Sequence, residues 1–199
     1  MRRVLSRAIA VALLMASPLS AHELADASAT VVVRDGGHVQ LRLQIPWADV
    51  LHATWMPKRS MQEFLVVVTN QPRADFARQL DAVQRSIERG TRLVADAGAP
   101  VTFTHWQGAT AAEVQEALKR ELMSRLADGD RFQHASRLAA TSEIALGHEI
   151  ATVRVQLPPT LGAALVTVYR PEERWVKPGE LSAPVTVARR SVTAAAPGR

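Results

Sequence analysis

The chain has 199 residues, 24 of them basic and 19 acidic, and it contains no cysteine. The lack of cysteine excludes disulfides, thiol catalysis and a lipid carried on a cysteine side chain. Three of the basic residues lie in an N-terminal segment that we expect to be removed, which leaves 21 against 19 in the mature chain. This near balance predicts no electrostatic surface for nucleic acid or for anionic lipid.

The first residues contain the three regions of a secretory signal peptide in the usual order. A basic start is followed by the apolar run Ala8–Ala16 and by the small-residue exit Ser17–Ala21. We therefore expect residues 1–21 to be cleaved and the mature domain to be periplasmic or secreted, with cleavage after Ala16 as the alternative. No later stretch approaches the roughly 20 apolar residues of a transmembrane helix, so we expect no membrane span after cleavage.

Residues 22–189 have the pattern of one α+β domain. The segments Ser28–Arg34 and Val39–Ile45 flank Asp35-Gly36-Gly37, and the period-two alternation of the second predicts a hairpin with one buried face. Pro46 ends that strand, and Trp47–Met56 is predicted to form a short helix. The continuous apolar run Phe64–Thr69 is predicted to be a buried central strand.

Two amphipathic helices are predicted in the middle of the chain. The first covers about residues 72–89 and is followed by Gly90, and the second covers about residues 110–129, where Thr110 and Glu113 have capping-box spacing. The segments between them are predicted to form a hairpin. Its two strands are Arg92–Ala95 and Val101–Trp106.

The final third has the pattern of strands separated by glycine and proline. The predicted strands are Ser136–Leu146, Glu149–Leu157, Ala164–Arg170, Arg174–Val176 and Pro184–Ala188. Residues 190–199 have little to bury and are predicted to be a disordered tail. The expected fold is α+β, with a mostly antiparallel sheet or sandwich and two amphipathic helices inserted mid-chain.

The common catalytic motifs are absent from the sequence. We find no Gly-x-Ser-x-Gly elbow, no glycine-rich phosphate loop and no dinucleotide fingerprint. His148-Glu149 begins like a zinc-protease motif, but Thr152 occupies the position of the second zinc ligand. The sequence therefore predicts no catalytic residue, no nucleotide or other organic cofactor, and a protein that is not an enzyme.

Histidine is the residue type most able to bind a metal here. Cleavage after Ala21 makes His22 the first residue, so that its amine and its ring could hold one ion, with another histidine as a third ligand for copper. This arrangement resembles the histidine brace of copper-binding exported proteins. His38 is one candidate for the further ligand, and the sequence does not choose between it and the other histidines. The other histidines are His52, His105, His134 and His148.

Three segments resemble the exported ectodomain of hydrogenase/urease accessory membrane proteins of the HupE/UreJ type. They are Ala21-His22-Glu23-Leu24, Leu93–Val101 and Ile150–Leu157. The resemblance implies a link to nickel or cobalt transport and an integral membrane transporter as partner. The membrane part of that family is absent from this sequence, and the resemblance transfers no functional residue.

Tryptophan supplies the candidate partner contact. The chain has four tryptophans, at 47, 55, 106 and 175, and core packing is the usual role of this residue. Trp175 instead lies among charged and turn-forming residues in 172–179, so we predict that it is exposed and contacts a protein partner.

Three functional hypotheses remain open. A non-enzymatic exported domain that binds a membrane or periplasmic protein predicts an exposed apolar or aromatic patch. A periplasmic copper- or nickel-binding protein predicts two further ligands near His22. An enzyme without recognisable motifs predicts a concave pocket lined by convergent polar groups.

Overall fold

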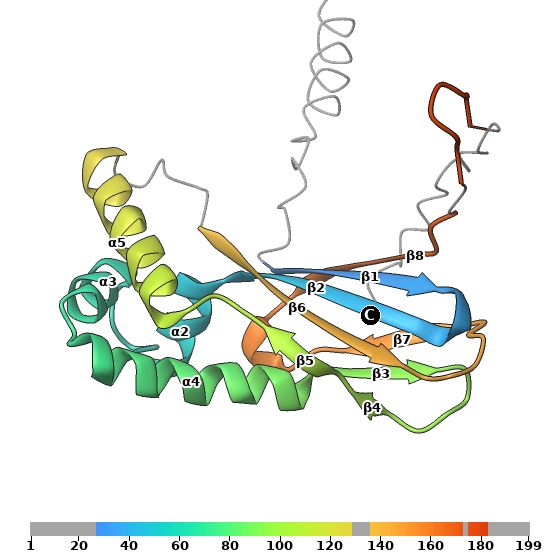
Figure 1. Ribbon diagram of the computed structural model, residues 1–199. Helices are drawn as coiled ribbons and strands as arrows, with labels where there is room; N and C mark the ends of the chain where they lie inside the picture. Colours follow the sequence, from blue (N-terminus) through green and yellow to red (C-terminus); the bar gives the residue numbers. More distant parts are fainter. Residues whose placement is uncertain (1–26, 129–135, 173–174, 183–199) are drawn as a thin grey trace, which may run out of the picture.

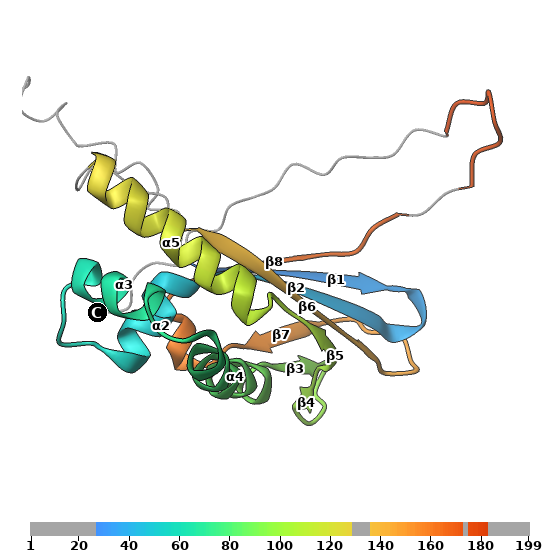
Figure 2. The same cartoon turned by 60° about the vertical axis from the view of Figure 1, so that its left-hand side comes forward.

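The computed structural model describes residues 27–128, 136–172 and 175–182. In these residues the fold is α+β, with two sheets and four helices, as the sequence predicts. Figures 1 and 2 show the helices gathered at one end of the sheets and the turn between the first two strands at the other end.

The N-terminal hairpin is confirmed. Strand β1 (Ala27–Arg34) pairs antiparallel with β2 (His38–Pro46), and the 3-10 turn η1 (Asp35–Gly37) joins them. Because side chains alternate between the two faces of a strand, every second residue of both strands is buried. The opposite face is mostly polar and more exposed, so the hairpin contributes one face to the core.

The hairpin forms the centre of a five-stranded sheet with the order β5-β6-β2-β1-β8. The added strands are β5 (Thr104–Gln107), β6 (Arg137–Ala145) and β8 (Ala164–Tyr169). Strand β8 pairs parallel with β1, and the other neighbours in this sheet pair antiparallel. Strand β8 therefore forms one edge of the sheet and β5 the other.

A three-stranded antiparallel sheet packs against one face of the first sheet, as Figure 1 shows. Its order is β4-β3-β7, with β3 (Arg92–Ala95) between β4 (Val101–Thr102) and β7 (Val153–Gln156). After β7 the chain passes through the short helix η3 (Pro159–Leu161) into β8 of the other sheet. The buried residues of both sheets and of all four described helices form one continuous core.

Three of the four helices agree with the prediction. They are α2 (Trp47–Trp55), α4 (Arg73–Gly90) and α5 (Ala111–Asp128). The predicted capping box at the start of α5 is present, because Thr110 Oγ1 accepts from Glu113 N at 3.3 Å and Glu113 Oε2 accepts from Thr110 N at 2.7 Å. The hydrogen bonds that the Glu113 carboxylate accepts from the backbone and the hydroxyl of Thr110 lower the pKa of Glu113.

The predicted strand Phe64–Thr69 is wrong, because these residues belong to helix α3 (Met61–Thr69). Ser60 and Glu63 form a capping box at its start, with the Ser60 oxygen accepting from Glu63 N at 3.2 Å. Phe64, Leu65 and Val68 are buried at helical spacing. The β-branched composition favours a strand, but the cap and the packing of this apolar stripe override it.

The predicted hairpin between α4 and α5 is only partly correct. Val101–Thr102 pairs with Arg92 and Leu93, but Thr104–Gln107 leaves that sheet and pairs with β6 in the five-stranded sheet. Trp175 and Val176 lie outside any strand, so the predicted strand Arg174–Val176 is not found in its described part. The predicted strand Pro184–Ala188 and the predicted tail at 190–199 lie outside the described residues.

Candidate partner-binding surface

The metal hypothesis depends on His22, which lies outside the described residues, as do the predicted signal peptide and His134. His38 is exposed at the start of β2, where it pairs with Arg34 at the far end of β1. The interpretation of His38 as a further ligand of an ion held at His22 stays a prediction.

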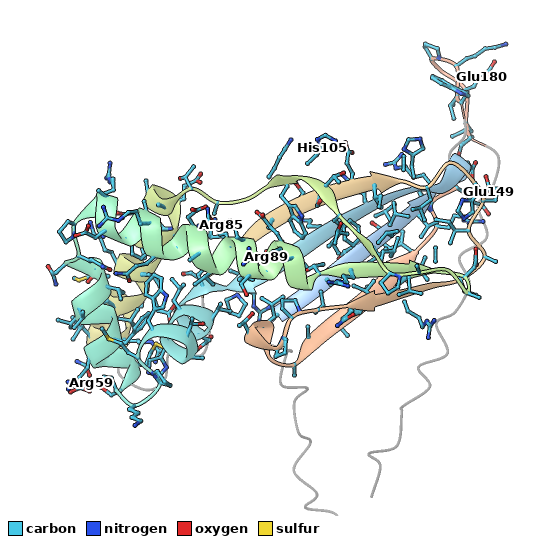
Figure 3. All side chains as sticks on the ribbon, turned by 90° about the horizontal axis from the view of Figure 1, so that it is seen from below. Arg59, Arg85, Arg89, His105, Glu149 and Glu180 are labelled. Atoms are coloured by element: carbon cyan, nitrogen blue, oxygen red, sulfur yellow. The ribbon has the colours of Figure 1, made fainter. Side chains whose placement is uncertain are left out.

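The described histidines do not converge on one point. His38 and His105 line a hollow of about 560 Å³ together with Glu143, and Figure 3 shows His105 at the margin of the body. His52 Nε2 lies 2.8 Å from Arg59 O, and His148 Nδ1 lies 3.0 Å from Leu146 O. Among residues 27–128, 136–172 and 175–182, no three histidine or carboxylate side chains are grouped closely enough to hold one metal ion.

A hollow of about 870 Å³ lies where α5 meets strands β2 and β6. Its polar lining consists of Arg42, Arg73, Gln107, Glu113, Glu116, Arg120 and Thr141. None of these side chains is buried, and the Glu113 carboxylate already caps α5. The hollow is therefore a solvated groove of mixed charge and offers no buried acid, base or nucleophile of the kind an active site uses.

One buried carboxyl lies apart from these hollows. Glu121 of α5 is 1% exposed, and its Oε1 accepts from Arg125 Nη2 at 3.0 Å and from Arg125 Nε at 3.2 Å. Burial raises its pKa above the usual range of a glutamate, the Arg125 guanidinium opposes this shift, and the charge of Asp49 on α2 adds to it. The packing of α5 therefore depends on whether Glu121 is protonated.

We expect the burial of Glu121 to give the fold a pH dependence. Because its pKa in the folded state is raised, the unfolded chain loses the proton first as pH rises above about 4.5. The contribution of Glu121 to the free energy of unfolding therefore falls as pH rises through the raised pKa. In urea titrations across this range, the stability of wild type relative to Glu121→Gln should decline with pH. The stability of wild type relative to the exposed control Glu116→Gln should show no such decline, because both proteins keep Glu121. Parallel curves for all three proteins would contradict this cause.

An apolar surface extends along β8 and the segment that follows it. The strand exposes Leu165 (56%), Val166 (42%), Val168 (43%) and Tyr169 (49%). Its register beside β1 places Val166 and Val168 on the same face as the buried Ala29 and Val31, and Leu165 and Tyr169 on the opposite face. Strand β8 thus exposes apolar side chains on both faces of the sheet. We call these four residues the β8 surface.

The described chain after β8 projects away from the body, as the position of Glu180 in Figure 3 shows. Its apolar side chains are Trp175 (104% exposed), Val176 (44%) and Leu181 (98%). A turn orders the middle of this segment, because Glu180 N donates to Lys177 O at 3.0 Å and Gly179 has φ of 84°. A proline followed by a glycine with positive φ is typical of a type II turn. We call residues 175–182 the Trp175 turn.

The predicted exposure of Trp175 is confirmed, and its role as a partner contact stays a prediction. Trp47 packs in the core as expected, at 2% exposure. The sequence reasoning missed the β8 surface, because an apolar strand is normally taken as buried. The available signal was the absence of any charged residue from Leu157 through Tyr169 in a strand near the end of the described domain.

Two further findings concern membrane-spanning helices and similarity to known proteins. None of the helices in the described ranges combines the length and the apolar character that crossing a bilayer requires. Comparison with protein-family models, with curated proteins and with solved structures found no match. The HupE/UreJ resemblance therefore stays a prediction.

Proposed function

We propose that this chain is a non-enzymatic exported domain that binds a membrane or periplasmic protein partner. The observation that carries the proposal is the exposure of the apolar side chains of the β8 surface and of the Trp175 turn. A fully exposed tryptophan is typical of an interaction hot spot, and two further apolar side chains lie on the same turn. The resemblance to HupE/UreJ ectodomains favours an integral membrane transporter as the partner.

The lack of a buried polar centre in the hollows of the described residues also favours binding over catalysis. The hydrogen bond from Glu180 N to Lys177 O orders the backbone in the middle of the Trp175 turn, and an ordered backbone loses less conformational entropy on association than a flexible segment. A partner that covers Trp175 and Leu181 would bury the two most exposed large apolar side chains of the described chain.

Photo-crosslinking in the native host tests this function. Benzoylphenylalanine replaces Trp175 in the full chain, and the matched control replaces Arg85, an exposed residue of α4 far from the turn in Figure 3. We expect a discrete crosslinked membrane or periplasmic protein from position 175 only. Trp175→Ala should then weaken the affinity for that purified protein by about tenfold or more.

Identical products from both positions, or no product from position 175, would overturn the binding function. The intact mass of the protein in periplasmic or secreted fractions tests export separately. We expect a chain that begins at His22, and an uncleaved chain retained in the cytoplasm would overturn the exported assignment. The metal-binding alternative stays a prediction that Cu(II) and Ni(II) titrations of wild type and His22→Ala would test.

A further inference from the structure

The four sheet edges in the described part of the chain are not protected equally. Strand β4 is only two residues long, β5 has a bulge with His105 at φ of 53°, and β7 carries the exposed Arg154. Short length, bulges and charges are the devices that prevent edge strands from pairing with other chains. Strand β8 has none of them over the six residues Ala164–Tyr169.

The nearest charge to the β8 edge is directed back into the same molecule. Arg170 Nη2 donates to Ile150 O at 2.5 Å and lies 3.9 Å from Glu149 Oε2. The guanidinium is thus committed to the loop that precedes β7. The edge is left uncharged, and its free backbone N–H and C=O groups can accept another strand.

The sequence of β8 is complementary to itself. In an antiparallel pair centred on Thr167, the two copies of Thr167 lie opposite each other, Val166 faces Val168, and Leu165 faces Tyr169. Thr–Thr and apolar cross-strand pairs of these kinds stabilise a sheet. The half-exposed valines of both copies would lie on the core side of one continuous sheet.

We propose that β8 pairs antiparallel with β8 of a second copy of this chain, about a two-fold axis at Thr167. The inference rests on the proposed function in that both treat the area after residue 164 as an interaction surface. It assigns the β8 surface to self-association and leaves the Trp175 turn free for the other partner. An isologous two-fold contact of this kind closes on itself and forms a dimer rather than a fibre.

Cysteine crosslinking tests the register directly, because the natural chain has no cysteine. In full-length protein, Thr167→Cys should form a disulfide-linked dimer on mild oxidation, since opposed Cα atoms about 4.5–5.5 Å apart suit a disulfide. The control Thr102→Cys lies exposed on the edge strand β4 and should stay monomeric under the same conditions. Equal crosslinking of the two variants would overturn the proposal.

A charge exchange gives an independent test without a covalent bond. By light scattering, wild type should be a dimer, whereas Thr167→Lys and Thr167→Glu should each dissociate at least roughly tenfold more readily because like charges face each other. An equimolar mixture should restore the dimer, because lysine then faces glutamate. The proposal is overturned if wild type is a monomer or if the mixture fails to associate while both variants keep the wild-type circular dichroism. Failure of these tests leaves the crosslink at Trp175 unaffected, so it is distinguishable from failure of the proposed function.

Discussion

Gly37→Ala should destabilise the protein by about 3 kcal/mol or more, whereas Gly147→Ala should cost only about 1 kcal/mol. Both glycines have φ of 74°, a left-handed conformation that L side chains rarely adopt. They differ in their surroundings. A Cβ on Gly37 would lie well inside van der Waals contact with the His148 carbonyl oxygen and 3.1 Å and 3.2 Å from the carbon and nitrogen of that residue, whereas nothing lies within 4 Å of a Cβ on Gly147.

The clash at Gly37 cannot be relieved by rotating a side chain, because the obstructing atoms are backbone. Moving the loop would strain two contacts that dock it on the β1–β2 turn. Leu146 N donates to Gly37 O at 3.0 Å, and Gly36 N donates to Glu149 Oε1 at 2.9 Å. These contacts hold the turn and the chain after β6 together at the end of the sheet remote from the helices.

Urea unfolding followed by tryptophan fluorescence measures both variants. With an unchanged m value, the shift of the midpoint gives the loss of stability. Equal losses for Gly37→Ala and Gly147→Ala would show that backbone conformation alone sets the cost and that the loop adapts freely.

The sequence predicted those strands and helices whose structure is determined by residues that are close together along the chain. The period-two alternation of Val39–Ile45 fixes the buried face of β2, and the spacing of Thr110 and Glu113 marks the start of α5. Pairing between distant segments has no such signal. Nothing local indicates that β8 lies parallel to β1, or that Thr104–Gln107 leaves its neighbour β4 for the other sheet.

The candidate surface was predictable only in part for the same reason. The charged and turn-forming neighbours of Trp175 indicate exposure, because they have no place in a core. The exposure of Val166 and Val168 depends instead on β8 being the last strand of its sheet, which is a property of the topology. Whether the histidines lie close together likewise depends on how β2, β5 and α2 are arranged. The positions of His38, His52 and His105 along the chain do not indicate this arrangement.

Substitutions in helix α3 have the second large expected effect on stability. They also distinguish a helix from a strand in the segment after Ser60. Phe64→Ala should destabilise the protein by about 3–5 kcal/mol, because Phe64 is fully buried and its ring lies 5.3 Å from that of His52. Val66→Ala should change stability by less than about 0.5 kcal/mol, since Val66 is 45% exposed and alanine is the better helix former.

A buried central strand would respond differently to the same pair of variants. Both faces of such a strand are covered, so Val66→Ala would leave a cavity and cost about 1 kcal/mol or more, and alanine would also lose the β propensity of valine. In the observed structure, Gln115 of α5 contacts the chain just after the C-terminal end of helix α3, because its Nε2 donates to Gln71 O at 2.9 Å. Urea midpoints for Phe64→Ala and Val66→Ala therefore distinguish the two structures, and a large loss at Val66 would contradict the helix.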